Sequence, residues 1–515
     1  MEKSNGKKLI VNLIASIVVF IVQICIGFWI SPFVIERLGE SAYGFITLAT
    51  SFTEYVTLLT VAINSMASRF ISIEYNKGNF KEANEYFSSV FWFNAILSIV
   101  IFITTICLVV NIDSIINVDS SLLRDVKVTF ALTFGNLIIS FIGTCYVSTT
   151  FVTNRMDINA YVQILSRIIK LFVIVSLFAL LIPKIYYVSL ANLLDTLIAL
   201  FLYIYLKNRL TPNFNINIKY FRLDKLLTIA KSGFWMLLSN ISSLFLNGMD
   251  ILIANLMVSQ AAMGRLSISK QLPIAVSSLL GYFSNIFTAS FTQLVALKKK
   301  EELIGEVNFT FRVLGTFLTV PFAGIIVFGL DFLNLWLPHN IYKKGDIQEI
   351  YILMMLTLSN IIVNAYMYSL HSIYIAINKV KRYSIVIFIC SIFSITVTII
   401  LTRFSNLGVY AIAGTSTVVL GFINLLWVPL YAEKVLCIKK FMFLKTIAKN
   451  YLALLLTSVF FWVIKFRLRF ETWLNFFVSI LIAAFLGYIV SFSFLLNKSE
   501  KYKLFRFIKR DFRGD

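Results

Sequence analysis

The sequence predicts an all-α polytopic membrane protein of about fourteen transmembrane helices, on the basis of its composition, its hydropathy pattern and an internal repeat. The 515 residues are 59% hydrophobic, and their mean hydropathy is +0.85. Soluble domains use roughly 45 to 50% apolar residues, so a soluble fold of this length could not hide so much apolar surface. Lipid is therefore the expected solvent for most of the chain.

Long apolar segments follow one another along the chain, separated by short polar connections. A helix needs about 20 mostly apolar residues to cross the hydrocarbon core of a bilayer. The first segment begins with basic residues, but its apolar run exceeds a signal-peptide core, so we expect it to remain as the first helix. The predicted spans lie at roughly 9–35, 43–68, 86–110, 125–151, 160–182, 185–206, 232–257, 265–296, 306–330, 348–375, 383–402, 408–430, 449–466 and 471–495.

The net charge of +21 is distributed one-sidedly along the chain. With a cytoplasmic N-terminus, about 32 Lys and Arg residues fall on the cytoplasmic side and about 12 on the other. The positive-inside rule then places both termini in the cytoplasm, and we expect a bacterial cytoplasmic membrane. The basic tail is expected to serve topology and to contact anionic membrane lipids, because no base-stacking or metal-finger motif points to nucleic acid.

An internal repeat divides the predicted helices into two groups. Residues 38–50, LGESAYGFITLAT, align with residues 258–270, VSQAAMGRLSISK, so that Gly44 matches Gly264. At nearly the same offset, the loops 77–85 and 298–306 correspond, as do the dipeptides at 154–155 and 378–379. The repeat predicts two six-helix lobes followed by two extra helices. The expected boundaries are an N-terminal lobe at 1–210, a cytoplasmic amphipathic linker at 211–231, a C-terminal lobe at 232–432, two helices within 433–495, and the basic tail at 496–515.

Polar residues recur at helical spacing in the first two helices of each lobe. Because polar side chains in membrane helices must face protein or water, such stripes predict a hydrated cavity. Hydrogen bonding between packed helices is the alternative interpretation. The residues chosen from these stripes are Glu54, Asn64, Asn247, Asp250, Lys270 and Asn285.

The opening of the chain carries a family resemblance. Residues 33–52, FVIERLGESAYGFITLATSF, together with Arg69 to Glu74 and the loop at 77–79, resemble bacterial polysaccharide repeat-unit flippases (O-antigen and capsule, Wzx-type). These form part of the multidrug/oligosaccharidyl-lipid/polysaccharide (MOP) exporter superfamily. The resemblance implies two six-helix bundles around a central cavity that opens alternately to each side. It also implies a cargo of undecaprenyl-pyrophosphate-linked sugars, moved from the inner to the outer leaflet for cell-surface polysaccharide biosynthesis.

Four cations within the predicted spans suit such a cargo: Arg167, Lys170, Arg265 and Lys270. An ionisable group in mid-bilayer costs at least about 3 kcal/mol unless it is paired or hydrated. A diphosphate crossing a low-dielectric region needs compensating donors, which Arg and Lys supply. Snorkelling of these side chains to the nearest interface is the alternative. Asp250 could balance Lys270 or bind a coupling cation, and the sequence leaves both roles open.

Catalytic motifs were also sought in the sequence. It has no Walker phosphate loop, no metal-spaced His or Glu pair and no nucleophile elbow, so we expect neither an enzyme nor a cofactor. Na⁺ or H⁺ are candidate coupling ions, and a polysaccharide polymerase and glycosyltransferases are candidate partners. Three alternatives stay open: a peptidoglycan-precursor (lipid II) flippase, a cation-coupled drug antiporter of the same superfamily, and a membrane glycosyltransferase or polymerase.

Overall fold

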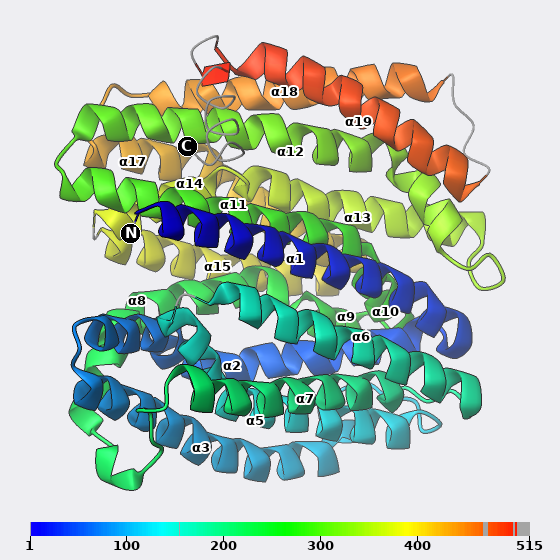
Figure 1. Cartoon of the computed structure of the whole chain (residues 1–515). Helices are drawn as coiled ribbons and strands as arrows, with labels where there is room; N and C mark the ends of the chain where they lie inside the picture. Colours follow the sequence, from blue (N-terminus) through cyan, green and yellow to red (C-terminus); the bar gives the residue numbers. More distant parts are fainter. Residues whose placement is uncertain (1, 154, 378, 467–471, 498–499, 502–515) are drawn as a thin grey trace. The chain divides into compact units, whose positions relative to one another are not determined.

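A computed structural model describes the backbone of residues 2–153, 155–377, 379–466, 472–497 and 500–501 (Figure 1). Within these ranges the side chains of 2–17, 20, 65, 281–290, 292–293, 296, 368 and 375–376 are left out of the description. All regular elements of the described ranges are helices. Thirteen helical segments in this part of the chain are long and apolar enough to cross a membrane. The predicted fold class, an all-α multi-pass membrane protein, is confirmed.

The predicted eighth span, 265–296, corresponds to two helices. They are α10 (Gln260–Ser269) and α11 (Gln271–Ala296), and the helical assignment is interrupted at Lys270. Pro273 accounts for the interruption, because proline has no N–H to donate to the carbonyl of Ser269, four residues earlier. The side chains of 281–290 lie outside the described residues. The span at 265–296, which would bring the thirteen candidate spans to the predicted fourteen, therefore stays a prediction.

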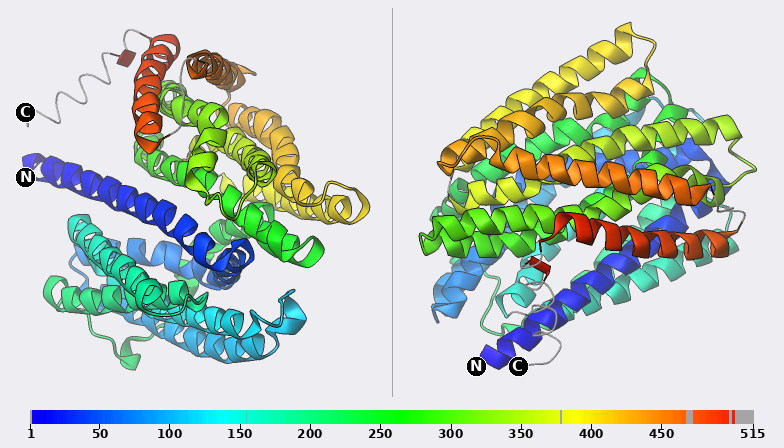
Figure 2. Two further views of the ribbon diagram at one scale, coloured as in Figure 1. Left: turned by 90° about the vertical axis from the view of Figure 1, so that its right-hand side faces the viewer. Right: turned by 90° about the horizontal axis from the view of Figure 1, so that it is seen from above.

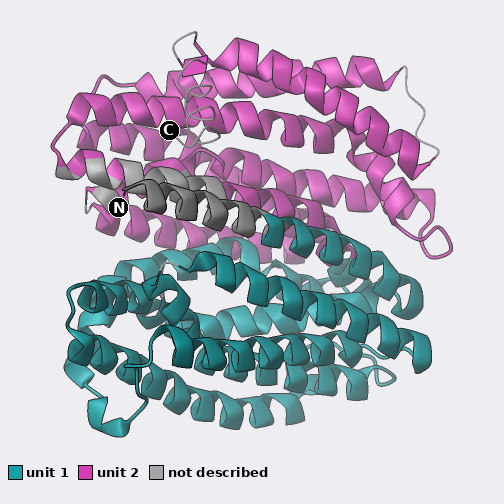
Figure 3. Cartoon of the chain, in the orientation of Figure 1, with its two compact units in different colours: residues 1–264 teal, residues 265–515 magenta. Residues whose placement is uncertain are grey.

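The chain divides into two compact units, residues 1–264 and 265–515 (Figure 3). In the first unit, α5 packs against α2, α3 and α7, while α8 packs along α2. The helices of this unit are α1 (Glu2–Leu38), α2 (Glu40–Asn76), α3 (Phe80–Val110), α4 (Ile112–Ile115), α5 (Leu123–Val152), α6 (Met156–Leu180), α7 (Tyr186–Leu210), η1 (Ile218–Tyr220), α8 (Leu223–Ser243), η2 (Leu244–Gly248) and α9 (Asp250–Met257).

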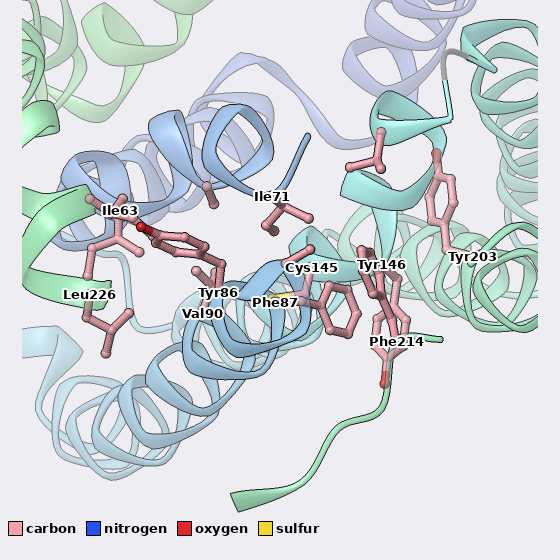
Figure 4. Close-up of a cluster of buried hydrophobic side chains, with 14 of the residues drawn as sticks. Ile63, Ile71, Tyr86, Phe87, Val90, Cys145, Tyr146, Tyr203, Phe214 and Leu226 are labelled. Carbon is pink, nitrogen blue, oxygen red and sulfur yellow. The ribbon is translucent and has the colours of Figure 1, made fainter. Parts of the chain in front are cut away.

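One apolar core of the first unit joins α2, α3, α5 and the start of α8 (Figure 4). Phe87 of α3 is fully buried, and its ring stacks on Phe214 with the centroids 4.9 Å apart. Phe214 belongs to the predicted linker, so this part of the linker is held in the core. The backbone N–H of Asn215 donates to the Asn84 side chain at 2.8 Å, and Ser88 donates to the carbonyl of Asn217.

The remainder of the predicted linker runs straight into a membrane helix. The linker at 211–231 was expected to be cytoplasmic and amphipathic. In the structure, α8 begins at Leu223 and continues without interruption through the start of the predicted seventh span. Leu226 and Ile229 are buried in the core of the first unit, whereas Leu223 and Leu227 are exposed, so the amphipathic pattern is that of a helix packed on one side.

In the second unit, α12 is the central helix and packs against α11, α13, α18 and α19. The two helices α18 and α19 match the predicted extra pair within 433–495, and α15 and α16 form a hairpin (yellow and gold in Figure 2). The further helices are α12 (Lys300–Trp336), α13 (Lys344–Asn364), α14 (Met367–Ala376), α15 (Val380–Phe404), α16 (Val409–Phe422), η3 (Ile423–Trp427), α17 (Val428–Val435), α18 (Met442–Lys465) and α19 (Trp473–Leu495).

The sequence repeat appears again as a repeated turn. Gly78 and Lys298, one in each of the two loops that the repeat pairs, both have positive φ, at 82° and 56°. In each turn this residue donates to the carbonyl three positions earlier, at 3.0 Å, and the next residue donates to the carbonyl five positions earlier, at 2.9 and 3.0 Å. A residue with positive φ commonly ends a helix, and glycine adopts this left-handed conformation without steric cost. The two turns are therefore copies of one backbone conformation.

The compact units and the predicted lobes divide the chain at different places. The units separate after Gly264, whereas the lobes were predicted to separate at 211–231. The difference arises because α8 and α9, expected to open the second lobe, pack against α2 in the first unit. Packing and sequence repetition are different criteria, so the predicted lobe boundaries stay a prediction.

Candidate functional site

The polar stripe of α2 meets the end of α8 in the first unit. Tyr55 donates a hydrogen bond to the carbonyl of Gly248 at 2.8 Å. Gly248 ends η2, a π-helical turn inserted between α8 and α9. π-turns widen the helix and recur at functional positions. The contact therefore joins a widened helical turn to the polar side of α2.

Two close contacts fix the helices on either side of this widened turn. On the α8 side, Gly233 lies so close to α2 that an added Cβ would overlap the Ala62 carbonyl. On the α9 side, the fully buried Asn255 accepts a hydrogen bond from the Asn117 N–H at 2.9 Å and donates to the Asn117 carbonyl at 3.1 Å. The turn is thus positioned by two fixed contacts within the first unit.

Carboxylates gather around Tyr55. Glu54 and Asp250 both interact electrostatically with the Tyr55 side chain, so the two predicted residues lie on the same part of the first unit. Glu54 and Asn247 are exposed, and Asp250 is partly exposed. Carboxylate, amide and carbonyl oxygens are the donor set that hard cations prefer. We call Glu54, Tyr55, Asn247, Gly248 and Asp250 the acidic patch.

Asn64 lies further along α2 and is tied to the core. Its carboxamide oxygen accepts a hydrogen bond from Asn94 of α3 at 3.1 Å. Asn94 is fully buried and also donates to the carbonyl of Phe141 on α5, at 3.1 Å. Asn64 therefore has a packing contact in addition to the cavity position that its stripe predicts.

Arg167 and Lys170 occupy one region between α1, α6 and α7. The Arg167 guanidinium donates to the Gln23 side chain on α1 at 3.0 Å. Lys170 is half-buried, attracted electrostatically by Asp195 of α7 and repelled by Arg167. One carboxylate oxygen of Asp195 is buried without a hydrogen-bond partner. Asp195 thus supplies a counter-charge to the region that these two cations share.

Lys270 is buried, with only 7% of its surface exposed, and lies at the break between α10 and α11. The neighbouring Ser267 and Ser269 are buried as well. A helix interrupted by proline leaves backbone groups available for other partners, and such breaks often form binding sites in membrane transporters. The position of Lys270 therefore combines a buried charge with an irregular backbone.

Arg265 is engaged differently, by carboxylates of the second unit. Its guanidinium lies 3.1 Å from Asp346 and forms a second ion pair with Glu349, both on α13. Two carboxylates compensate its charge and compete with any anionic ligand. The cargo-binding role of Arg265 stays a prediction, and its ion pairs hold the second half of α10 against α13.

The structure leaves parts of the predicted site apart or undescribed. The side chain of Asn285 lies outside the described residues. In the first unit, Glu54 and Asp250 come together at Tyr55, and Arg167 and Lys170 form a separate cluster. Tyr55 and Asp195 were missed as site residues. An ionisable residue within an apolar span was the available signal for Asp195, whereas nothing in the sequence singles out Tyr55. Among the described residues, no group of three or more His, Cys, Asp or Glu could hold a metal ion.

Solved structures of membrane transporters have folds similar to the fold of this chain. The chain resembles a structure titled "Lipid II flippase MurJ, inward closed conformation", with a TM-score of 0.70 and 15% identity, covering 94% of this chain and 98% of that one. It also resembles an inward-facing multidrug resistance MATE family transporter of the MOP superfamily, with a TM-score of 0.66 and 12% identity, covering 83% and 98%. The chain has the fold of a MOP-superfamily transporter.

Sequence comparisons agree with the MOP fold. A family model described as MatE matches residues 15–179. The chain is 25% identical over 500 residues to "Uncharacterized membrane protein EpsK" of Bacillus subtilis (strain 168), covering 96% of this chain and 97% of that protein. A MOP superfamily transporter from Pyrococcus furiosus, whose title reports reversed polarity of the binding pocket, has a TM-score of 0.59 and 12% identity, covering 84% and 97%. The solved MOP proteins named here are transporters and a flippase, none of them named as an enzyme.

Proposed function

We propose that this chain is a flippase that moves undecaprenyl-pyrophosphate-linked oligosaccharide repeat units from the inner to the outer leaflet of a bacterial cytoplasmic membrane by alternating access. The MOP fold supports a transport function of this general kind. The specific cargo rests on the cations within the membrane helices. The observation that carries the proposal is Lys270, buried to 7% exposure at the break between α10 and α11.

A buried lysine at such a break suits a phosphate-bearing cargo. A diphosphate that enters a low-dielectric region needs positive charge beside it, and a buried ammonium supplies that charge. The Arg167 and Lys170 cluster adds two further cations, of which Arg167 can offer a bidentate fork to phosphate oxygens. In this proposal Lys270, Arg167 and Lys170 contact the diphosphate at successive stages of transport, with Asp195 balancing the second site at rest.

The acidic patch gives the proposal a coupling site. Its oxygens could hold Na⁺, or its carboxylates could take up H⁺, so that an ion gradient drives the cycle. The same patch supports a second candidate function, a cation-coupled drug antiporter, because acidic groups also attract cationic drugs. A lipid II flippase shares the diphosphate requirement and differs from the first proposal in its sugar.

Reconstitution with defined cargo separates these functions. Proteoliposomes containing the purified chain would be loaded with undecaprenyl-pyrophosphate-linked oligosaccharide, with lipid II, or with a fluorescent organic cation. Transfer of the two lipids is measured by their accessibility to an external sugar-modifying enzyme, and cation movement is measured by fluorescence. Faster transfer of the oligosaccharide lipid supports the proposal. Preferential lipid II transfer or cation export alone would assign one of the alternatives.

A further inference from the structure

The two glycines that the sequence repeat aligns, Gly44 and Gly264, lie against each other in the first unit. A Cβ added to Gly44 of α2 would stand 3.1 Å from the Cα of Gly264 on α10, and 2.7 Å from the Cε of Met263. A Cβ added to Gly264 would overlap the backbone carbonyl of Glu40. Because glycine has no side chain, these two helices approach at backbone distance. We call Glu40, Gly44, Met263 and Gly264 the outer crossing, since the predicted topology puts these ends of α2 and α10 outside.

Polar contacts hold the same end of the first unit. Asn117, in the connection between α4 and α5, donates its side-chain amide to the carbonyl of Asn255 at 3.0 Å, in addition to the two bonds between these residues described above. Gln260, the first residue of α10, donates to the Asp119 carboxylate at 3.2 Å. The end of α9 and the start of α10 are therefore tied to this connection by hydrogen bonds and to α2 by close packing.

Burial changes along α2 from the outer crossing to the acidic patch. Residues 42–46 are buried, and so is Met263 of α10. Further along α2, Glu54 is exposed, as is Asn247 on the π-helical turn. A helix rises about 1.5 Å per residue, so Gly44 and Glu54 lie roughly 15 Å apart along α2. The acidic patch is thus accessible, whereas the outer end of the same helix is closely packed.

We propose that the outer crossing is a gate that closes the acidic patch off from the outer side of the membrane. The inference rests on the alternating access of the proposed function, which requires this end to open in one state. A gap of about 0.5 to 1 Å forfeits roughly a quarter to a half of the dispersion energy between packed atoms, so one methyl group in the crossing disfavours closure. In the closed state a coupling ion reaches the patch from the cytoplasm alone, and in the open state it reaches the patch from outside.

Side-specific labelling tests the gate without any cargo. In a variant without the five native cysteines, Asn247→Cys is labelled with a membrane-impermeant maleimide, in right-side-out vesicles and in inverted vesicles. We expect labelling from the cytoplasmic side and slow labelling from the outer side. Adding Gly264→Ala should raise the outer rate about tenfold and lower the cytoplasmic rate, because its methyl group collides with the Glu40 carbonyl only when the crossing is closed.

Two further glycine variants complete the test. Gly135→Ala on α5 is the matched control: its methyl group would meet Leu193 at an ordinary 3.7 Å, so both labelling rates should stay unchanged. Gly44→Ala should raise the outer rate less than Gly264→Ala does, because the end of the Met263 side chain can move aside. Gly44→Ala also keeps the test decisive if Gly264→Ala fails to reach the membrane.

Opposite changes of the labelling rate on the two sides of the membrane support the gate. Unchanged outer labelling in both variants of the crossing, at normal abundance, would overturn it. Equal increases on both sides would overturn it too, because that result indicates loosened packing. The cargo assay is independent of this test: a chain that transfers no oligosaccharide lipid but shows the opposite changes would keep the gate and lose the proposed cargo.

Discussion

Among single residues, Lys270 bears most of the proposed chemistry, because its charge is buried at a helix break. Replacing it with Gln removes the charge and keeps a similar length. A hydrogen bond to a charged group is worth about 1.5 to 3 kcal/mol, so Lys270→Gln should lower cargo transfer roughly 10- to 100-fold, and Lys270→Arg should retain part of it. Arg167→Gln should act in the same direction but less severely, because Lys170 remains on the same face.

The measurement for these variants is cargo transfer in proteoliposomes, with membrane abundance as the control. The snorkelling interpretation expects charge loss to be tolerated, or to reduce abundance alone. Normal transfer by Lys270→Gln and by a double neutralisation of Arg167 and Lys170, at normal abundance, would place the cationic cargo site elsewhere.

Water access to the acidic patch can be checked at Asn247. In a variant without the five native cysteines, cysteine at Asn247 should react with a small hydrophilic maleimide, because this position is exposed. Cysteine at Asn64 should react more slowly, since Asn64 is partly buried beside Asn94. Asn255→Cys is the matched control, because Asn255 is fully buried and accepts a hydrogen bond from the Asn117 N–H. Inertness at both Asn247 and Asn64, from both sides of the membrane, would leave the polar stripes as packing features.

Residue types and spacing identified the charged positions in the spans but not their partners. Arg265 is compensated by Asp346 and Glu349, which follow some eighty residues later on α13. Helical periodicity relates residues only within one helix, so it cannot say which distant carboxylate a cation meets. For the same reason Glu54 and Asp250 were predicted separately, and only the fold brings both to Tyr55.

At the scale of elements, Gly233 tests how α8 is held against α2. An added methyl group there would collide with the Ala62 backbone, which cannot move aside as a flexible side chain could. Gly233→Ala should destabilise the protein by about 1 to 3 kcal/mol, as overpacking does. Gly305→Ala on α12 is the control, because nothing lies near that Cβ and alanine favours the helix. Thermal unfolding in detergent measures both, and an unchanged melting temperature for Gly233→Ala would contradict the close crossing.

Hydropathy predicted the membrane helices well and their irregularities poorly. The predicted spans correspond to helices along the described chain, because crossing hydrocarbon imposes length and composition on each of them. The π-helical turn at 244–248 has no proline within it to announce it, and its widened geometry is held by contacts with α2. We did not predict that residues 223–230 form the first turns of the membrane helix α8, because an amphipathic pattern does not distinguish a surface helix from one packed on a single side.

For the whole molecule, the distribution of Lys and Arg predicts that both termini are cytoplasmic. A reporter that works only in the cytoplasm, such as a fluorescent protein that folds there, should be active when it is fused after Asp515. A reporter placed in the turn between α15 and α16 should show the opposite, because the predicted topology puts this turn outside. Activity of the C-terminal fusion only outside the cell would overturn the topology and the helix count together.

The central claim is that this MOP-fold protein moves a diphosphate-linked oligosaccharide lipid across the membrane. Its most direct test measures transfer of undecaprenyl-pyrophosphate-linked oligosaccharide in proteoliposomes, comparing the unaltered protein with Lys270→Gln and with protein-free vesicles. We predict rapid transfer by the unaltered protein and transfer roughly 10- to 100-fold slower by the variant. Protein-free rates for the unaltered, correctly folded protein, over oligosaccharide lipids of several compositions and with Na⁺ and H⁺ gradients applied, would contradict the account.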